Sequence, residues 1–568
     1  MTAVLTSSIE AAETDADPVT PWIDLGYGVA LSPNGGSPGA LQVLTDQAVR
    51  LIATLHRSIE VKRQKLLATR ESLQREWDDG DVPSYLDPDS EAVQGAWQVA
   101  EIPPDLRCRR VEITGPVNDA KMVINMLSRN EAGYRADCAM VDFEDSMKPS
   151  WANVVAGIQN VAAAARKELC HVRPASRTRP RKEYALDSDD MAKLLVRVRG
   201  LHLDESNLRV DGAPVSAGLF DLALCLLHGA APQLQRGETP AFYVPKVEHH
   251  LEARWWNLLF VEAQQAIGLE PGTLRATFLI ETLPAAFQME EILFEVREHA
   301  AGLNVGRWDK IFSDIKVLKT HPDRVMADRG SIGMNRRWMR NYATRLIRIC
   351  HKRGAYAIGG MAAFTPGRTP ELRQHQTSKV LADKKAEFQL GHDGCWVSHP
   401  FFIGPALTAF PKDQQLDVRH EGQNPRPELL PGSTPPYSLN GLRTNVRVGI
   451  AYLEGWRRDI GCVAWDDLME DLATLEISRA QTWQWLRHGV TLEADGLEGG
   501  LRVDEDLVRR VFDEELDRVL HEIDGELEDR PEQREARRAS FLAAQQEALD
   551  IFTEKEFRPF LSSASNLA

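Results

Sequence analysis

Eight short apolar segments recur through the middle of the chain. Each is followed by Gly, Pro or an acidic residue, and most are then followed by a segment with helical spacing. Strands and helices that alternate eight times predict a closed (β/α)₈ barrel, a fold of the α/β class. A doubly wound sheet is the structural alternative, but Ile-Thr-Gly-Pro follows the first segment where that fold usually has a Gly-rich fingerprint. The segments are residues 109–115, 138–145, 194–200, 241–248, 276–281, 302–312, 355–364 and 394–400.

The regions on either side of these segments have a different composition. The N-terminal part begins as a loose lead-in rich in Thr, Asp, Pro and Gly, and residues 41–78 then show the spacing of one or two amphipathic helices. Six prolines between residues 411 and 436 indicate a linker, and a helical pattern without strand-like alternation follows it. A basic stretch at 171–190 predicts an exposed insertion in the barrel. The predicted organisation is an N-terminal lead-in and helical clasp (1–105), a barrel (106–410), a Pro-rich linker (411–439) and a C-terminal helical domain over the barrel mouth (440–568).

Charge and cysteine content restrict the class of function. The net charge of −16 argues against nucleic acid or an anionic membrane as the main partner. Seven scattered cysteines without a Cys-x-x-Cys pair indicate reduced thiols and no zinc site, and no apolar run approaches 18 residues. We therefore expect a cytoplasmic protein without a membrane span, whose site must supply its own positive charge if its substrates are anionic.

Two acidic residues end neighbouring segments of the predicted barrel. Glu281 closes the apolar run Thr-Phe-Leu-Ile-Glu, and Asp309 ends the Gly-rich stretch 302–309. Because the carboxyl ends of parallel strands meet at one rim of a barrel, these carboxylates should lie close together. Two hard oxygen ligands that leave positions open for water and substrate suit Mg²⁺. The alternative is that both are ordinary surface acids at strand ends.

Other strand ends add charged residues to the same rim. Acids from the second strand could support a metal site from outside its ligand shell, and arginines from the third could hold an anionic substrate. The alternative for each residue, and for Lys246 and Glu248 in particular, is an ion pair that closes the rim. These residues are Asp142, Glu144, Asp145, Arg197, Arg199, Lys246 and Glu248.

Residues 297–309, Arg-Glu-His-Ala-Ala-Gly-Leu-Asn-Val-Gly-Arg-Trp-Asp, resemble the signature of the malate synthases in their A-type form. Further matches run from about residue 41 to 490, and they include Val-Asp-Phe-Glu-Asp at 141–145 and Leu-Met-Glu-Asp at 468–471. The resemblance implies a Mg²⁺-dependent acyltransferase of the glyoxylate cycle. Such an enzyme condenses acetyl-CoA with glyoxylate and hydrolyses the malyl thioester to (S)-malate and CoA. It would be a monomer or a small homo-oligomer.

The resemblance also implies roles for individual residues. Asp471 falls on the catalytic base and Arg199 on the arginine that stabilises the enolate oxygen, while Glu281 and Asp309 fall on the metal ligands. Without the resemblance, Asp471 would be interpreted only as a favourable charge near a helix N-terminus. The turn that binds glyoxylate comprises Gly306, Arg307, Trp308 and Asp309, and the matched CoA-binding positions are Pro366 and Met469.

Departures from the family pattern leave alternatives open. Val198, Leu201 and Lys310 stand where the family usually has Pro, Trp and Tyr. Lys310 could point away along its strand, or it could pair with a rim carboxylate such as Glu144 or Asp145. One alternative function is a malyl- or citramalyl-CoA lyase, which would lack the N-terminal helices and the C-terminal domain. The other is a catalytically silent homologue that binds a CoA ester, which the three departures favour.

Overall fold

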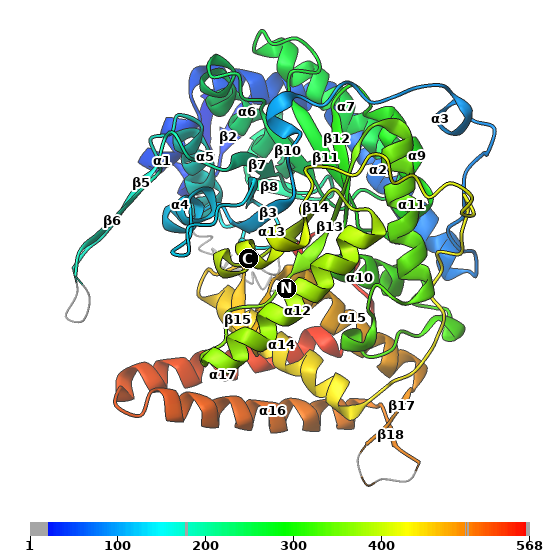
Figure 1. Ribbon diagram of the computed structural model, residues 1–568. Helices are drawn as coiled ribbons and strands as arrows, with labels where there is room; N and C mark the ends of the chain where they lie inside the picture. Colours follow the sequence, from blue (N-terminus) through cyan, green and yellow to red (C-terminus); the bar gives the residue numbers. More distant parts are fainter. Residues whose placement is uncertain (1–20, 176–179, 495, 497–498, 564–568) are drawn as a thin grey trace, which may run out of the picture.

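The computed structural model describes residues 21–175, 180–494, 496 and 499–563. Its centre is a closed barrel of parallel strands, in the order β10-β11-β12-β13-β14-β3-β4-β7 (Figure 1). The predicted (β/α)₈ fold is confirmed, because each of the eight apolar segments contributes one barrel strand. The strands are β3 (Val111–Pro116), β4 (Cys138–Asp142), β7 (Lys193–Arg197), β10 (Ala241–Val244), β11 (Arg275–Ile280), β12 (Ala300–Val305), β13 (Tyr356–Ala362) and β14 (Gly394–Val397).

Helices surround this barrel and bury the outer faces of its strands. They are α4 (Ala120–Leu127), α5 (Trp151–Ala165), α6 (Ala217–Gln235), α7 (His250–Ala266), α8 (Leu283–Phe287), α9 (Met289–Glu295), α10 (Arg307–Val317), α11 (Arg337–Arg353), α12 (Pro370–Leu390) and α13 (Ile403–Ala409).

Helix α6 is long and apolar enough to cross a membrane by length and composition, although we expected no such run from the sequence. Its most apolar window is 72% buried, and the helix packs against α5 and α2. Burial inside an α/β protein accounts for this composition, since a helix that is hydrophobic all round is typical of a protein core.

The N-terminal region is more ordered than the sequence indicated. Strands β1 (Ile23–Gly26) and β2 (Val29–Leu31) lie in the predicted loose lead-in, and they form a four-stranded sheet with β8 (Asp204–Val210) and β9 (Ala213–Ser216). The expectation of an irregular lead-in is thus wrong from residue 23. Helices α1 (Pro38–Val43) and α2 (Asp46–Asp78) follow, and α2 packs along α6 and α7. Arg70 of α2 donates a hydrogen bond to the backbone carbonyl of Lys246 at 2.7 Å, so this helix reaches the barrel rim.

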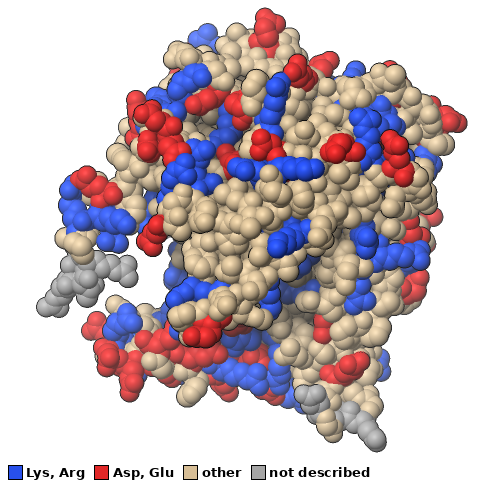
Figure 2. All heavy atoms as spheres, viewed as in Figure 1, with Lys and Arg blue, Asp and Glu red and all other residues tan. Residues whose placement is uncertain are grey.

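The basic insertion forms a hairpin, β5 (Cys170–Arg173) and β6 (Lys182–Ala185), which projects from the body in Figure 1. The Pro-rich segment 411–438 contains no helix or strand, but it is fastened to the barrel surface. The Tyr85 hydroxyl donates to the Pro427 carbonyl at 2.7 Å, and Asn341 donates to the Glu428 carbonyl at 2.8 Å. On the face seen in Figure 2, acidic and basic side chains are interspersed, as expected for a protein that does not bind a polyanion there.

The C-terminal domain lies against the barrel and has a core of its own. Contrary to the expectation of helices alone, it also contains two short hairpins. A shared apolar cluster joins it to the barrel, with Ile311 and Phe312 of α10 packed against Ile477 of the domain. The elements are α14 (Leu439–Arg457), β15 (Val463–Trp465), β16 (Leu468–Glu470), α15 (Leu472–His488), β17 (Thr491–Leu492), β18 (Leu501–Arg502), α16 (Glu505–Glu526) and α17 (Pro531–Phe552).

Candidate active site

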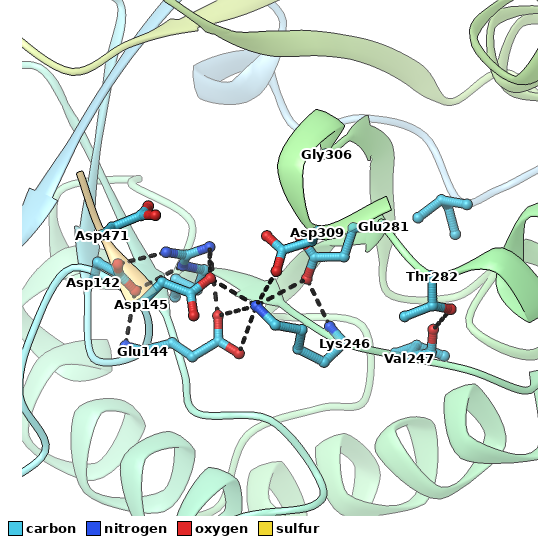
Figure 3. Close-up of polar contacts among 12 residues, drawn as sticks. Asp142, Glu144, Asp145, Lys246, Val247, Glu281, Thr282, Gly306, Asp309 and Asp471 are labelled. Carbon is cyan, nitrogen blue, oxygen red and sulfur yellow. Dashed lines mark hydrogen bonds and ion pairs between the residues drawn. The ribbon is translucent and has the colours of Figure 1, made fainter. Parts of the chain in front are cut away.

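The two predicted metal-binding acids meet at the carboxyl ends of adjacent strands. Glu281 directly follows β11, and β11 pairs in parallel with β12, in register at Ile280 and Val305. Asp309 lies four residues beyond β12, in the first turn of helix α10, so it belongs to a helix and not to a strand end. Both carboxylates are buried and point toward the same space (Figure 3).

The ammonium group of Lys246 lies at the centre of the acidic cluster. Its Nζ atom is 2.6 Å from Asp145, 3.0 Å from Asp309, 3.3 Å from Glu144 and 3.8 Å from Glu281. Figure 3 shows this side chain reaching between the two pairs of acids. Lys246 has a positive φ of 54°, a sparsely populated conformation for a residue with a side chain, as is common at functional sites. The sequence interpretation of Lys246 as one rim ion pair among several therefore missed its central position.

Glu248, two residues further on, does behave as the rim ion pair that we considered. Its carboxylate pairs with Lys316, and Arg70 of helix α2 lies 3.6 Å from it. It thus faces away from the cluster around Lys246.

Arg197, and not Arg199, forms ion pairs with the acidic cluster, although Arg199 lines a small cavity beside Glu144. Arg197 ends β7 and forms a fork with Asp142 at 2.7 and 2.5 Å, and its third nitrogen is 3.5 Å from Glu144. The guanidinium of Arg199 is fully engaged elsewhere, by Asp221 at 2.7 and 2.9 Å and by Glu205 at 3.0 Å. Residues two positions apart face the same side only within a strand. Because β7 ends at Arg197, this rule does not apply to Arg199. The position that we expected for Arg199 is thus held by Arg197.

The carboxylates outnumber the cations at this rim. Burial, and after it the neighbouring carboxylate of Asp145, raises the pKa of Glu144, and burial likewise raises the pKa of Asp309. The Oε2 atom of Glu281 is buried without a hydrogen-bond partner among the described residues. An additional cation with a preference for oxygen ligands fits such a set. No group of three or more His, Cys, Asp or Glu is arranged for a metal in the described ranges.

The turn between β12 and α10 approaches Glu281 closely. A Cβ atom on Gly306 would lie 2.8 Å from Oε2 of Glu281, so a larger residue would occupy this space. Gly306 is the N-cap of α10, and no side chain caps the first-turn amides. Free N–H groups at a helix N-terminus bind anions. The Gly306 amide itself donates to the Tyr342 hydroxyl at 3.2 Å, and that hydroxyl donates to the Ile280 carbonyl, so Tyr342 links the two strand ends.

Asp471 reaches this rim from the C-terminal domain. It is the N-cap of α15, where it accepts a hydrogen bond from the Thr474 amide at 3.3 Å. The next amide, of Leu472, donates to the backbone carbonyl of Asp145 at 3.1 Å, which holds the helix start against the barrel. Burial, followed by the Asp145 carboxylate, raises the pKa of Asp471 to about 7, while Arg197 opposes the shift. A carboxyl group with such a pKa is suited to exchange protons at neutral pH.

Three family models match successive parts of the chain. They describe the malate synthase N-terminal domain (residues 37–91), TIM barrel domain (193–427) and C-terminal region (437–564). A malate synthase of Myxococcus xanthus is 44% identical over 492 residues, which is 85% of this chain and 88% of that protein. The chain belongs to the malate synthase family. Malate synthase A of Escherichia coli is 40% identical, over 85% of this chain and 89% of its own. A solved Haloferax volcanii malate synthase is more distant, with 13% identity and a TM-score of 0.43 over 78% of this chain and 98% of that one.

A cavity of about 1060 Å³ leads from the surface to Asp471. Trp308 and Met469 line its inner part together with Asp471, while Lys121 and Lys182 line it further out. Met469 is held there because its amide donates to the Ala363 carbonyl at 2.8 Å, across the boundary between barrel and C-terminal domain. Pro366, the other residue matched to CoA binding, is not among the residues that line this cavity.

The departures from the malate synthase pattern are buried in the structure. Val198 and Leu201 lie in the barrel core, at 0% and 1% exposure. Lys310 is fully buried within α10 and pairs with Asp314 on the next turn of that helix. The hypothesis that it pairs with Glu144 or Asp145 is therefore wrong, since Lys246 fills that role.

We expect Lys310→Met to lower the free energy of unfolding by roughly 3 kcal/mol, because it leaves the Asp314 carboxylate buried and unpaired. Lys310→Met combined with Asp314→Leu should recover most of that loss, since both charges are then absent. Urea unfolding measures both values. Equal destabilisation of the single and the double variant would contradict an ion pair as the role of Lys310. Turnover of the folded fraction should remain within a few-fold of wild type, because neither side chain enters the cavity.

Proposed function

We propose that the protein condenses acetyl-CoA with glyoxylate and hydrolyses the malyl thioester to (S)-malate and CoA, with Mg²⁺ as cofactor. The observation that carries this proposal is the position of Asp471. Its carboxyl group has a pKa of about 7 and comes from a separate domain to a rim that already holds two metal-binding acids and an arginine. A site that combines these groups suits removal of a proton beside a carbonyl.

The methyl group of a thioester is a weak carbon acid. A carboxylate removes its proton only if the enolate oxygen is stabilised as its negative charge develops. In our proposal Asp471 takes the proton, and Arg197 donates hydrogen bonds to the enolate oxygen. Arg197 is suited to this because Asp142 holds two of its nitrogens and leaves Nη1 directed at the cluster.

Glyoxylate would be held by the turn at the start of α10. The uncapped amides after Gly306 would bind its carboxylate. Glu281 and Asp309 would hold Mg²⁺, which when bound supplies a Lewis acid and template for the aldehyde and carboxylate oxygens. The enolate carbon then bonds to the aldehyde carbon, and water hydrolyses the resulting thioester to release CoA.

The larger cavity would hold the acyl donor. It has the size of a pocket for a sizeable ligand and runs from Asp471 to the surface. The ammonium groups of Lys121 and Lys182 lie 5.7 and 4.8 Å from the centre of the Tyr184 ring, in the outer part of this cavity. Cations at that end suit the phosphate groups of CoA.

The lyase and silent-homologue alternatives are less well supported. The match to the malate synthase C-terminal region over residues 437–564 favours a synthase over a shorter lyase. Glu281, Asp309, Arg197 and Asp471 are all present around one space, which argues against a silent homologue.

The proposal is tested by mixing the purified full chain with acetyl-CoA and glyoxylate and following free CoA with a thiol reagent. We expect CoA release that requires both substrates and Mg²⁺ and that stops on addition of EDTA. Malate should form in an equal amount. Release of CoA without glyoxylate, or cleavage of malyl-CoA to acetyl-CoA as the faster reaction, would favour the alternatives.

We expect Arg197→Lys to reduce turnover by about 10²-fold or more, because a point charge cannot keep the fork with Asp142 and also reach the enolate oxygen. Arg199→Lys disturbs the contacts with Asp221 and Glu205 instead, so it should lower the melting temperature while the folded enzyme stays within a few-fold of wild type. Steady-state kinetics and thermal melts of both variants check this. A larger loss of turnover in Arg199→Lys than in Arg197→Lys would instead identify Arg199 as the arginine that stabilises the enolate oxygen.

We expect kcat/KM for acetyl-CoA to rise with pH and to reach half of its maximum near pH 7, because Asp471 accepts a proton only when it is ionised and its pKa is raised to about 7. An aspartate with its ordinary pKa would give a profile that is flat down to about pH 5. A pH series at saturating Mg²⁺ and glyoxylate distinguishes the two. A flat profile would show that the base titrates elsewhere.

A further inference from the structure

A second cavity, of about 680 Å³, lies beside the larger one and contains neither Asp471 nor the metal-binding acids. The two cavities share five residues of their walls, Trp308, Met361, Ala363, Met469 and Thr474. The rest of the second cavity is formed by the start of α10, residues 328–331, the end of β13 with Phe364 after it, strand β16, helix α12 and helix α14.

Arg307 faces this cavity without a partner. It makes no hydrogen bond or ion pair with any residue in the part of the chain that the structure describes, and its guanidinium carbon lies 4.0 Å from the centre of the Trp308 ring. The carboxylates of Asp383 and Glu387 lie close enough to act on its charge, but both form ion pairs with Lys384 instead. A partly buried guanidinium that makes no ion pair keeps its donors free for a bound anion.

A second arginine lies against the same indole ring. Arg329 is 6% exposed, and its guanidinium carbon is 5.4 Å from the centre of the Trp308 ring. Its side-chain hydrogen bonds, to the Thr474 carbonyl and to Glu470, are both at 3.5 Å, the long limit for such a contact. Neither arginine is therefore saturated by protein groups.

Three cations and three acids line the cavity, so its preference depends on which of these charges are already paired. Lys379 of α12 adds an ammonium group to the wall. The acids in the wall already have partners, because Asp328 accepts hydrogen bonds from Ser438 and Asp383 pairs with Lys384 at 3.2 Å. Glu470 is the acid next to Arg329.

We propose that this cavity is a second anion-binding site, which takes a small dianion between Arg307 and Arg329 over the Trp308 ring. Guanidinium groups bind carboxylate and phosphate alike, because both present paired oxygens to the fork. The shared chemistry is thus a dicarboxylate or a phosphate group. The site is separate from the proposed reaction, since the proposed base, the enolate-stabilising arginine and the metal-binding acids are not among the residues that line it.

The test is calorimetric titration of the full chain with succinate and, separately, with inorganic phosphate. EDTA keeps the acidic cluster free of metal, so that it repels dianions, and saturating CoA fills the larger cavity. We expect one dianion to bind per chain, and succinamide, which is uncharged, not to bind. Arg329→Gln should weaken binding by about tenfold or more, the effect of losing a charge-assisted hydrogen bond. Arg337→Gln removes an exposed arginine that does not line the cavity, so it should leave binding unchanged.

A second variant covers the case in which Arg329→Gln does not fold. Thr444 is exposed on α14 and lines the cavity, so Thr444→Glu should fold and place a competing carboxylate in the site. Binding of succinate alone would identify a dicarboxylate site, and binding of phosphate alone a phosphate site. The proposal is overturned if neither anion binds, if an anion binds only in the absence of CoA, or if binding survives Thr444→Glu.

Discussion

Asp471→Asn should reduce malate formation by about 10²–10⁴-fold, the usual cost of removing a general base. Asparagine keeps the shape of the side chain and can still cap α15, so the fold should be retained. The proton on the acetyl methyl group then has no acceptor. Exchange of the methyl hydrogens of acetyl-CoA with solvent deuterium, followed by NMR, should stop together with turnover.

Asp504→Asn is the matched control for this variant. Asp504 caps another helix of the same domain, α16, by accepting a hydrogen bond from the Leu507 amide at 2.8 Å. If Asp471 acted only as a helix cap, the two variants would behave alike. If Asp471→Asn keeps more than about a tenth of wild-type turnover, the base lies elsewhere.

Glu281→Gln and Asp309→Asn should each remove Mg²⁺-dependent turnover, with a loss of about 10²-fold or more. Each replaces a charged oxygen ligand by an amide of the same shape, so the expected defect lies in metal binding and not in packing. Each variant also removes one negative charge from a cluster in which carboxylates outnumber cations. The metal-free protein should therefore be at least as stable as wild type, and its melting temperature should no longer rise when Mg²⁺ is added.

Glu248→Gln tests whether any rim acid gives this result. Its carboxylate pairs with Lys316, so its loss should lower stability and leave the thermal response to Mg²⁺ intact. A variant of Glu281 or Asp309 that still responds to Mg²⁺ would show that the ion binds elsewhere.

The meeting of Glu281 and Asp309 could be predicted because it follows from local pattern and strand order alone. An apolar run that ends in an acid predicts the end of β11, the Gly-rich stretch predicts the turn after β12, and a parallel barrel brings these neighbouring ends together. The choice between Arg197 and Arg199 could not be predicted in this way. It depends on the residue at which β7 ends and on Asp221, which captures Arg199 from helix α6.

Contacts between distant segments account for the other errors. Strands β1 and β2 are only four and three residues long, and β2 is stabilised by pairing with β8, about 180 positions later, so no periodicity marks them. The central place of Lys246 results from four acids on three different strand ends or turns. The approach of Asp471 depends on contacts between the C-terminal domain and the barrel, such as the backbone hydrogen bond from Leu472 to Asp145, which a sequence pattern cannot reveal.

The hydrogen bond from Leu472 to Asp145 can form only late in synthesis of the chain. Every barrel strand, from β3 to β14, leaves the ribosome before Leu472 has been translated. The carboxylates around Lys246 are thus first surrounded by water, and they are covered only when α15 docks on the finished barrel. A nascent chain at that stage already carries Glu281 and Asp309 but has no Asp471, so under the proposed mechanism it cannot remove a proton from acetyl-CoA before the C-terminal domain has been made.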